Sequence, residues 1–349
     1  MLFLPLLALL LTPAASLQQT VDEALAAPIR DRRFSGVVLV QQDSRTLLRK
    51  AYGLADRSLG TPNTPDTRFM IMSVSKQFTA ALILRLVAQG RLDVHDRVSD
   101  YLPDWPAEWD AVTIHDLLSH SAGTDIDTTY FWLVRHHPEY WPDLSTAPPP
   151  YVPRPLVTTP GTTYLYSNIG YTLLTRIASA ATGRAFDDLM AEEVFCPLGM
   201  DHTVDERGTR VPGRAHGYRR TADGFELSEQ KTIDIVGAGD VVSTVDDLAR
   251  WDEALLDDRF LPAAQRTAMF APHVQAKKGW IGYGWFLRTL DGRPLRFHAG
   301  SGAGFRAWNY VLPESRINVI ILSNVADDQS DWALDLLTRI ESALIATNN

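Results

Sequence analysis

The sequence predicts an α+β fold, in which an antiparallel β-sheet flanked by helices is combined with an all-helical subdomain. Short apolar segments separated by turn residues occur near both ends of the chain, and helix-like segments lie between them. The strand-like segments near the C-terminus follow one another closely, which favours antiparallel pairing because parallel strands need a long crossover. We therefore expect one sheet assembled from the two ends of the chain.

The expected strands come in two groups. Near the N-terminus, Val37–Val40 and Thr46–Leu48 predict a hairpin that turns at Gln42–Ser44. Near the C-terminus, apolar segments parted by Gly, Pro and charged residues predict strands at Gly284–Leu287, Leu295–Phe297, Trp308–Val311 and Asn318–Leu322.

The expected helices lie mainly between these groups. Val74–Gln89 is apolar almost all round and stops at Gly90, which is typical of a buried helix with a glycine cap. Thr113–Asp116 and Thr244–Asp247 resemble capping boxes with Asp in place of Glu. Further helices are expected at Ile169–Ala180 and Ser330–Ala346. The order predicts one unit over 17–349, with an α/β subdomain at about 17–72 and 236–349 and a mainly helical one at about 73–235.

Composition excludes one class of partner. The chain has 349 residues, of which 45% are apolar and 21% charged, as in ordinary globular proteins. Its formal net charge is -9, and it has no basic tract. A nucleic-acid partner is not expected, because binding phosphates needs clustered Lys and Arg.

The N-terminus resembles a secretory signal peptide. A Leu-rich run from Leu2 to Leu11 precedes the small residues Ala14–Ser16, which predicts cleavage near Ser16 and an exported, periplasmic or secreted protein. The run lacks the usual preceding Lys or Arg. An uncleaved anchor is the alternative, but about ten apolar residues are too few to span a bilayer, so no stable membrane span is expected.

Two features carry no assigned chemistry. Cys196 is the only cysteine, which excludes an internal disulfide, and we expect it to be a small buried apolar residue. The Pro-rich stretch 142–160 is too interrupted for regular structure; with Trp141 and Tyr151 it could form a lid over a site or an ordinary surface loop.

The first candidate catalytic residues are Ser73 and Lys76. Residues three apart on a helix share a face, so the Ser73 hydroxyl and the Lys76 amine can meet. A serine hydroxyl needs a neighbouring base to become a strong nucleophile. Lysine can be that base when burial disfavours its charged form, and the residues around Lys76 are strongly apolar. The alternative is a chance Ser-x-x-Lys whose lysine extends into water.

Two further segments carry candidate site residues. Tyr166-Ser167-Asn168 follows a Pro-Gly turn and precedes an expected helix, so Tyr166 and Asn168 can face a cleft. A phenol near an ammonium ionises more easily, and an amide offers both a donor and an acceptor. His298–Gly302 follows an expected strand, and its glycines allow a ligand to approach the backbone closely.

In this order, the three segments resemble the motifs of the serine β-lactamase and penicillin-binding superfamily. Tyr166-Ser167-Asn168 is similar to the Tyr-x-Asn motif of its class C-like branch, which includes esterases and D-aminopeptidases (peptidase family S12). His298-Ala299-Gly300 is similar to a His-x-Gly variant of Lys-Thr-Gly. The resemblance extends to Leu117–Gly123, Pro197–Met200 and Ala238–Asp240, and so covers nearly the whole chain after residue 16.

The resemblance implies a role for each of these residues. Ser73 would be acylated, Lys76 and Tyr166 would share the proton transfers, and Asn168 would hold the substrate. The backbone N–H groups of Ser73 and Ser301 would form the oxyanion hole. His298 and Gly300 would line the substrate site. The implied substrate is a small molecule or short peptide with an ester, amide or D-amino-acid peptide bond, and no metal or other cofactor is implied.

Two other functions stay open. A zinc site could be imagined from His115, His120 and His136–His137, but their spacing fits no His-Glu-x-x-His pattern, and His120 is expected to be structural. The chain could also be a sensor that is acylated by β-lactams or peptides without efficient turnover.

His298 sets an expectation about substrate charge. Unlike lysine, an unperturbed histidine, with a pKa near 6.5, is mostly neutral at pH 7.5 and gains charge towards pH 5.5. We therefore expect weak β-lactamase activity and a preference for neutral substrates and, if His298 faces the substrate, better use of anionic substrates at low pH. The alternative is that His298 merely packs at a strand end.

Overall fold

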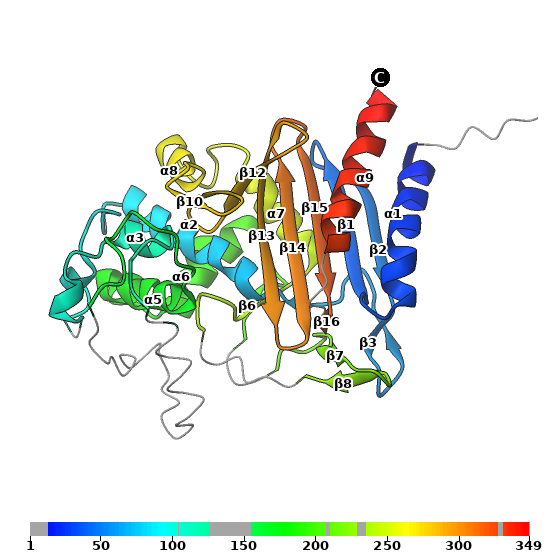
Figure 1. The fold of residues 1–349 in the computed structure, drawn as a ribbon, viewed down its shortest axis with the longest axis horizontal. Coiled ribbons are helices and arrows are strands. Elements are labelled where there is room, and N and C mark those ends of the chain that lie inside the picture. Colours follow the sequence, from blue (N-terminus) through cyan, green and yellow to red (C-terminus); the bar gives the residue numbers. More distant parts are fainter. Residues whose placement is uncertain are drawn as a thin grey trace, which may run out of the picture.

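The structure is a computed structural model that describes residues 13–103, 105–125, 127, 155–206, 210–228, 235–326 and 331–348. Its main sheet has eight strands in the order β10-β11-β12-β13-β14-β15-β1-β2, and every neighbouring pair is antiparallel (Figure 1). The strands are β1 (Gly36–Gln42), β2 (Arg45–Tyr52), β10 (Val274–Ala276), β11 (Gly279–Ile281), β12 (Phe286–Leu290), β13 (Arg293–Gly302), β14 (Phe305–Leu312) and β15 (Ile317–Ser323). Both ends of the chain build this sheet, so the predicted fold class is confirmed.

The N-terminal hairpin lies inside the sheet. β1 is paired on both sides, so that Val38 lies opposite Ile321 of β15 and Lys50 of β2. Asp43 and Ser44, at the turn, both have positive φ angles, of 50° and 64°, which lets β2 return directly alongside β1. The unbroken apolar run of β1 follows from burial on both faces.

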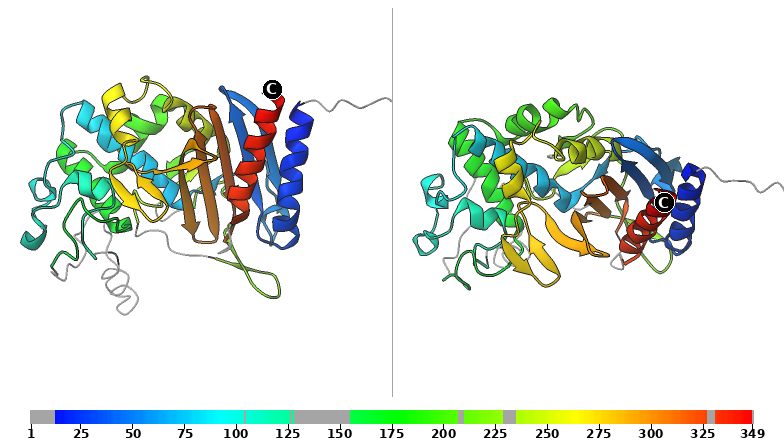
Figure 2. Two further views of the ribbon diagram at one scale, coloured as in Figure 1. Left: turned by 45° about the horizontal axis from the view of Figure 1, so that its top comes forward. Right: turned by 90° about the horizontal axis from the view of Figure 1, so that it is seen from above.

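Each face of the sheet is covered by its own core. On the outer face, the helices α1 (Pro13–Arg30) and α9 (Asp331–Asn348) lie side by side (Figures 1 and 2). They pack against apolar side chains such as Val38 and Ile321. The opposite face, with Val37 and Leu322, joins the larger core that it shares with the helical part of the chain. The site described below lies on this inner side.

The helical part is built around α2, whose thirteen residues are mostly buried. The other α-helices among the described residues are α3 (Ile114–Leu118), α5 (Asn168–Thr182), α6 (Phe186–Met190), α7 (Val245–Ala254) and α8 (Ala263–Met269), and α2 itself spans Lys76–Ala88. Of these, α7 also packs against β1 and β15 of the main sheet. Shorter turns are the 3-10 helices η1 (Met72–Ser75), η2 (Val98–Asp100), η3 (Ala107–Trp109) and η6 (Cys196–Leu198), and the π-helix η5 (Ala191–Phe195). The predicted helices at 74–89, 169–180 and 330–346 are confirmed to within a few residues.

The helix caps follow the sequence signals with one difference. Gly90 has a φ of 66°, as a glycine that ends a helix requires, and Thr113 and Asp116 form both halves of a capping box. Thr244 caps α7 through its hydroxyl. The Asp247 carboxylate, however, accepts the His202 N–H and the Thr203 hydroxyl, both from outside the helix, and binds the Arg250 guanidinium within α7.

Three small sheets connect the parts. They are formed by β3 (Leu54–Asp56) with β4 (Thr61–Pro62), by β5 (Phe69–Met70), β9 (Val241–Ser243) and β6 (Val204–Asp205), and by β16 (Val325–Ala326), β7 (Tyr218–Arg220) and β8 (Phe225–Leu227). β6 and β7 thus pair with β9 and β16, which lie outside the predicted helical range. The predicted subdomain boundaries stay a prediction.

Several expectations concern other parts of the chain. Trp141, Tyr151, His136–His137 and most of the Pro-rich stretch lie outside the described residues. Within the described residues, no helix combines the length and apolar content that crossing a membrane requires. The prediction that Cys196 is buried is wrong: it begins the short turn η6, followed by Pro197, and its side chain is exposed.

Candidate active site

Ser73 lies on the turn η1, directly before helix α2. Met72, which precedes it, has a φ of 50°, a left-handed conformation that costs a non-glycine residue about 1–3 kcal/mol and is often found at functional sites. The Ser75 hydroxyl holds the turn by donating to the Met72 carbonyl at 2.6 Å and accepting the Val241 N–H at 3.2 Å. Ser73 is partly exposed between the buried residues Met72 and Val74. The turn therefore presents the Ser73 side chain from a fixed backbone.

Strand β13 contacts this turn at Gly300. A Cβ atom on Gly300 would lie 2.2 Å from the carbonyl oxygen of Ile71, so only glycine permits the observed approach. A Cβ on Gly302 would similarly lie 2.5 Å from the Met72 side chain. The sequence suggested that these glycines make room for a ligand, but their close neighbour is the turn itself. The approach brings the exposed residue Ser301 to the same part of the molecule as Ser73.

Lys76 is fully buried at the start of α2, with no exposed surface. Its Nζ donates to the Asn168 Oδ1 atom and to the Ala238 carbonyl oxygen, both at 2.8 Å. Nζ also lies 4.9 Å from the centre of the Tyr166 ring. An ammonium has three N–H groups, so these two acceptors leave one position on the nitrogen for proton exchange.

Burial sets the charge state of Lys76. Desolvation lowers its pKa to about 7, against the opposing attraction of the Asp127 and Asp240 carboxylates. Close to neutral pH, a large fraction of the Lys76 side chain is therefore an uncharged amine that can accept a proton. This is the property a general base needs.

Tyr166 lies between the other groups of the site. Its hydroxyl takes part in a hydrogen bond with the Ser73 side chain, which lowers the pKa of Tyr166. Desolvation is the larger effect and raises that pKa above its usual value, although 36% of the residue's surface is exposed. The expectation that the phenol ionises more easily is therefore wrong. Tyr166 is neutral and can pass a proton on rather than hold a negative charge.

Asn168 and Tyr166 flank the N-terminus of α5. Asn168 is the first residue of the helix, and the Ser167 hydroxyl caps it by accepting the Gly170 N–H at 2.7 Å. The structure thus brings Ser73, Lys76, Tyr166 and Asn168 together at the junction of α2 and α5.

Two further residues support this junction. Asp127 accepts the backbone N–H of Asn168 at 2.7 Å, and His120 accepts that of Ser167 at 3.1 Å through Nδ1. Sequence analysis expected His120 to be structural and missed Asp127 altogether. Asp127 belongs to no recognisable motif, and its role depends on contact with residues 40 and 41 positions away.

His298 lies on β13, two residues before Gly300, and is only 2% exposed. Its Nδ1–H donates to the Ala299 carbonyl at 2.9 Å, and its ring lies 5.1 Å from that of Phe286. Burial, together with the positive charge of Lys76, lowers the pKa of His298 to about 3. The expected gain of charge between pH 7.5 and 5.5 is therefore wrong, because the buried imidazole stays neutral throughout that range.

The histidines considered for zinc have other partners. The His115 Nδ1 atom lies 2.6 Å from the Tyr283 hydroxyl, and His120 binds Ser167 as described. Among the residues that the structure describes, no three His, Cys, Asp or Glu side chains are arranged to hold a metal ion.

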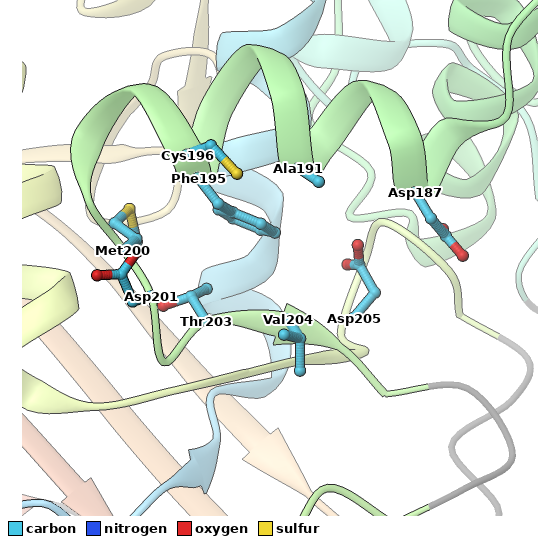
Figure 3. Close-up of a pocket in the computed structure, with 9 residues that line it drawn as sticks. All are labelled: Asp187, Ala191, Phe195, Cys196, Met200, Asp201, Thr203, Val204 and Asp205. Atoms are coloured by element: carbon cyan, nitrogen blue, oxygen red, sulfur yellow. The ribbon is translucent and has the colours of Figure 1, made fainter.

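One cavity lies away from these residues. It has a volume of about 400 Å³ and is bounded by η5, η6 and β6 (Figure 3). The exposed Cys196 lines it together with Asp187, Asp201 and Asp205. None of the predicted site residues contributes to its walls.

Comparison with known proteins identifies the family. Residues 17–343 match the family model described as Beta-lactamase. The chain is 29% identical over 336 residues to penicillin-binding protein 4* of Bacillus subtilis (strain 168), covering 89% of this chain and 72% of that one. It is 30% identical over 318 residues to a D-aminopeptidase of Brucella anthropi, covering 86% of this chain but only 58% of the relative.

A solved structure agrees with this relationship. The crystal structure of a penicillin-binding protein from Bacillus halodurans superposes with a TM-score of 0.79 at 26% sequence identity, covering 91% of this chain and 99% of that one. The family model spans nearly the whole chain, and the structural match extends over both the sheet and the helical part. The chain belongs to the beta-lactamase family.

Proposed function

We propose that this chain is a serine hydrolase that cleaves an ester, amide or D-amino-acid peptide bond through an acyl-enzyme on Ser73. The observation that carries the proposal is the environment of Lys76, a fully buried amine with a pKa of about 7. The Lys76 Nζ atom lies 4.9 Å from the centre of the Tyr166 ring, and the Tyr166 hydroxyl forms a hydrogen bond with Ser73. Family membership and the likeness to a D-aminopeptidase support the same chemistry.

The first half of the reaction forms the acyl-enzyme. The neutral Lys76 amine accepts the proton of the Ser73 hydroxyl, directly or through the Tyr166 hydroxyl, while Ser73 Oγ bonds to the substrate carbonyl carbon. The N–H groups of Ser73 and Ser301 stabilise the negative carbonyl oxygen. When the bond to the leaving group breaks, the proton held by Lys76 passes to the departing alcohol or amine.

The second half returns the enzyme to its starting state. A water molecule gives a proton to Lys76, directly or through the Tyr166 hydroxyl, and attacks the acyl carbon. The tetrahedral intermediate collapses, the Ser73–acyl bond breaks, and the proton returns to Ser73 Oγ as the acid product leaves. Tyr166 takes part as a neutral relay, since burial raises its pKa. Asn168, fixed by its bond to Lys76, offers its amide N–H groups to the substrate.

The site favours substrates without a carboxylate beside the scissile bond. The position that holds lysine in the Lys-Thr-Gly pattern is occupied by His298, which is buried and neutral. Anionic β-lactams therefore lose an ionic contact, and we propose weak β-lactamase activity. Neutral esters, amino-acid amides and short D-peptides are the proposed substrates, the last because of the likeness to the D-aminopeptidase.

Labelling with a fluorophosphonate tests the nucleophile. Intact-protein mass spectrometry should show a single adduct, and peptide mapping should place it on Ser73. Ser73→Ala should abolish labelling while leaving the circular dichroism spectrum and melting temperature close to those of the wild type. An adduct on Ser121 or Ser301 would assign the nucleophile elsewhere.

A substrate panel tests the reaction. Short p-nitrophenyl esters, D-amino-acid amides, D-dipeptides and a cephalosporin should be compared for steady-state turnover. Many turnovers for at least one neutral substrate are expected. Stoichiometric acylation of Ser73 without turnover of any substrate would instead support the sensor function.

We also propose that the protein is exported. The support is the Leu-rich run Leu2–Leu11 followed by the small residues Ala14–Ser16. Leu17, the first residue after the proposed cleavage position, is already buried in the outer core. N-terminal sequencing of protein recovered from the periplasm or medium should begin near residue 17.

A further inference from the structure

Ser167, the middle residue between Tyr166 and Asn168, is held by three different partners. Its backbone N–H donates to His120 Nδ1 at 3.1 Å, and its hydroxyl donates to the Asp127 carboxylate. The same hydroxyl oxygen accepts the Gly170 N–H at 2.7 Å. Both the N–H and the hydroxyl of Ser167 are thus bonded within the protein, and the residue is only 8% exposed. Ser167 therefore serves as an anchor for its two neighbours.

Asp127 anchors the helix that carries Asn168. One carboxylate oxygen accepts the N–H groups of Asn168 at 2.7 Å and Ile169 at 3.3 Å, while the other accepts the Ser167 hydroxyl. The first N–H groups of a helix have no partner within it, and the helix dipole favours a negative charge there. Asp127 meets both needs of α5. It thereby fixes the position of Asn168, the hydrogen-bond partner of Lys76.

His120 fixes Tyr166 from the other side. The two rings are stacked with centroids 4.5 Å apart and an angle of 29° between their planes. The His120 carbonyl oxygen accepts the Leu165 N–H at 2.7 Å. The backbone of His120, which has a φ of 55°, and its ring therefore both contact the segment 165–167. Burial holds the pKa of His120 well below its usual value, so the ring is neutral and Nδ1 is free to accept the Ser167 N–H.

We propose that His120 and Asp127 are positioning residues that hold Tyr166 and Asn168 in their orientation towards Ser73 and Lys76. The inference rests on the proposed function, since it assigns Tyr166 and Asn168 to the reacting groups. Neither His120 nor Asp127 is assigned contact with substrate. They act through Ser167, whose backbone and hydroxyl they bind from opposite sides.

Asp127 has a second effect that a purely structural residue would lack. Burial raises the pKa of Asp127 itself, while its bonds to Ser167, Asn168 and Ile169 and the charge of Lys76 favour the carboxylate. In its charged form Asp127 stabilises the ammonium form of Lys76, as does Asp240. The other titratable groups around Lys76 are neutral: His120 and His298 have lowered pKa values, and Tyr166 and Tyr171 have raised ones. Replacing the Asp127 carboxylate by an amide should therefore lower the pKa of Lys76 further. The activity of that variant should then persist to a lower pH.

The central test compares Asp127→Asn with Asp116→Asn. Asp116 is a matched control because it also caps a helix, α3, through bonds to the Thr113 N–H and hydroxyl. For Asp127→Asn, kcat/KM for a short p-nitrophenyl ester should fall about 10- to 100-fold, the scale of a small displacement of reacting groups. The acid limb of its pH profile should move to a pH about one lower than in the wild type. Asp116→Asn should leave the limb in place.

Ser167→Ala separates position from charge. It removes the hydroxyl bond to Asp127 but keeps the carboxylate, so kcat should fall while the acid limb stays at the wild-type pH. This variant also keeps the proposal testable if Asp127→Asn does not fold, as judged by circular dichroism. A wild-type kcat in Ser167→Ala would overturn the proposed anchoring.

His120→Asn and His120→Ala test the other partner. An asparagine oxygen can take the place of Nδ1 as acceptor of the Ser167 N–H, whereas alanine cannot. We expect His120→Ala to lose about 10- to 100-fold in kcat and His120→Asn to recover part of that loss. Equal rates in wild type and both variants would contradict the role of His120.

The outcomes separate this inference from the proposed function. If fluorophosphonate does not label wild-type Ser73 and no ester is hydrolysed, the proposed function fails. If the wild type is labelled and active but Asp127→Asn and His120→Ala keep its rate and its pH profile, the proposed function stands and the positioning role fails.

Discussion

At the scale of single residues, the site depends on how completely each side chain is removed from water. Lys76 and His298 are both buried bases, and burial lowers the pKa of each. Lysine begins from a much higher value, so the same effect leaves Lys76 near 7 and His298 near 3. One thus becomes a base that works at neutral pH, while the other becomes a neutral group that cannot attract an anion.

The first prediction concerns Lys76. Its neutral form should be the active one. We therefore expect kcat/KM to be low below about pH 7, where the amine is protonated, and to increase as the pH rises above this value. Lys76→Ala should lower kcat by about 10² to 10⁴, and Tyr166→Phe by a similar factor. Because the two groups share one proton path, the double variant should lose little more than either single one. Additive losses would show that they act separately.

The second prediction concerns His298. The ratio of kcat/KM for an anionic ester to that for a neutral ester of the same shape should stay constant between pH 7.5 and 5.5, since the imidazole does not titrate there. His298→Lys should raise the ratio at every pH if the new cation reaches the substrate carboxylate. His298→Gln is the neutral control. A ratio that increases towards pH 5.5 in the wild type would mean that the imidazole is protonated there.

At the scale of elements, a buried polar network joins helices α2 and α7 to strand β14. The Asn309 amide of β14 donates to the Gln77 Oε1 of α2 at 3.1 Å and to the Asp252 carboxylate of α7 at 2.7 Å. The Trp251 indole also donates to Gln77, at 3.0 Å. Gln77 follows Lys76, and Asn309 lies opposite His298 in the sheet. The network thus fixes the two elements that carry these site residues.

The third prediction follows from the charge of Asp252. Burial raises its pKa well above the usual value, and the Asn309 bond opposes this only in part. A carboxyl whose folded pKa is raised stabilises the fold at low pH, and this contribution is lost as pH rises through that pKa. The contribution of Asp252 to the free energy of unfolding should therefore decrease as the pH rises from 5 to 8, while the lowered pKa values of His120, His298 and Lys76 act in the opposite direction.

Asp252→Asn should remove this pH dependence. The amide has nearly the shape of the protonated carboxyl, and it can donate to Asn309 Oδ1, which is buried without a hydrogen-bond partner among the described residues. Urea unfolding should therefore show that the free energy of unfolding of the variant, relative to that of the wild type, increases from pH 5 to pH 8, so that the variant is at least as stable as the wild type at pH 8. A less stable variant at pH 8 would indicate that Asp252 is ionised and stabilising.

At the scale of the whole molecule, local sequence signals predicted the helices and strands better than they predicted the contacts between distant segments. The hairpin at 36–52, helix α2 and the late strands follow from apolar periodicity, glycines and turn residues, all of which are local. The pairing of β6 with β9 and of β7 with β16 has no local signature. Ser73, Lys76, Tyr166 and Asn168 could be proposed as site residues from the sequence because they lie in motifs, and the structure brings them together.

The missed features share one physical cause. Asp127 acts through residues far along the chain, and the pKa of His298 depends on burial by several elements and on Lys76. Cys196 was expected to be buried from its residue type, but the turn that begins there leaves it at the wall of a cavity. Such properties arise only when the elements are assembled, so composition and spacing do not predict them.

The last prediction concerns helix α1 and the outer core. Leu17, Val21 and Leu25 recur every four residues on one side of α1 and are buried against the sheet and α9. A chain that begins at Leu17, the proposed first residue after cleavage, keeps all three side chains. Its melting temperature and kcat should therefore match those of the full chain, whereas a chain that begins after Arg30 should melt at a much lower temperature.

Leu25→Ala tests the packing alone. Removing a fully buried leucine side chain should cost about 2–5 kcal/mol in the free energy of unfolding, measured by urea titration. Turnover below the melting temperature should change little, because the outer core and Ser73 lie on opposite sides of the sheet. Gln19→Ala, on the exposed side of α1, is the control and should cost less than about 0.5 kcal/mol. A loss of kcat without a loss of stability in Leu25→Ala would show that α1 influences the site through the sheet.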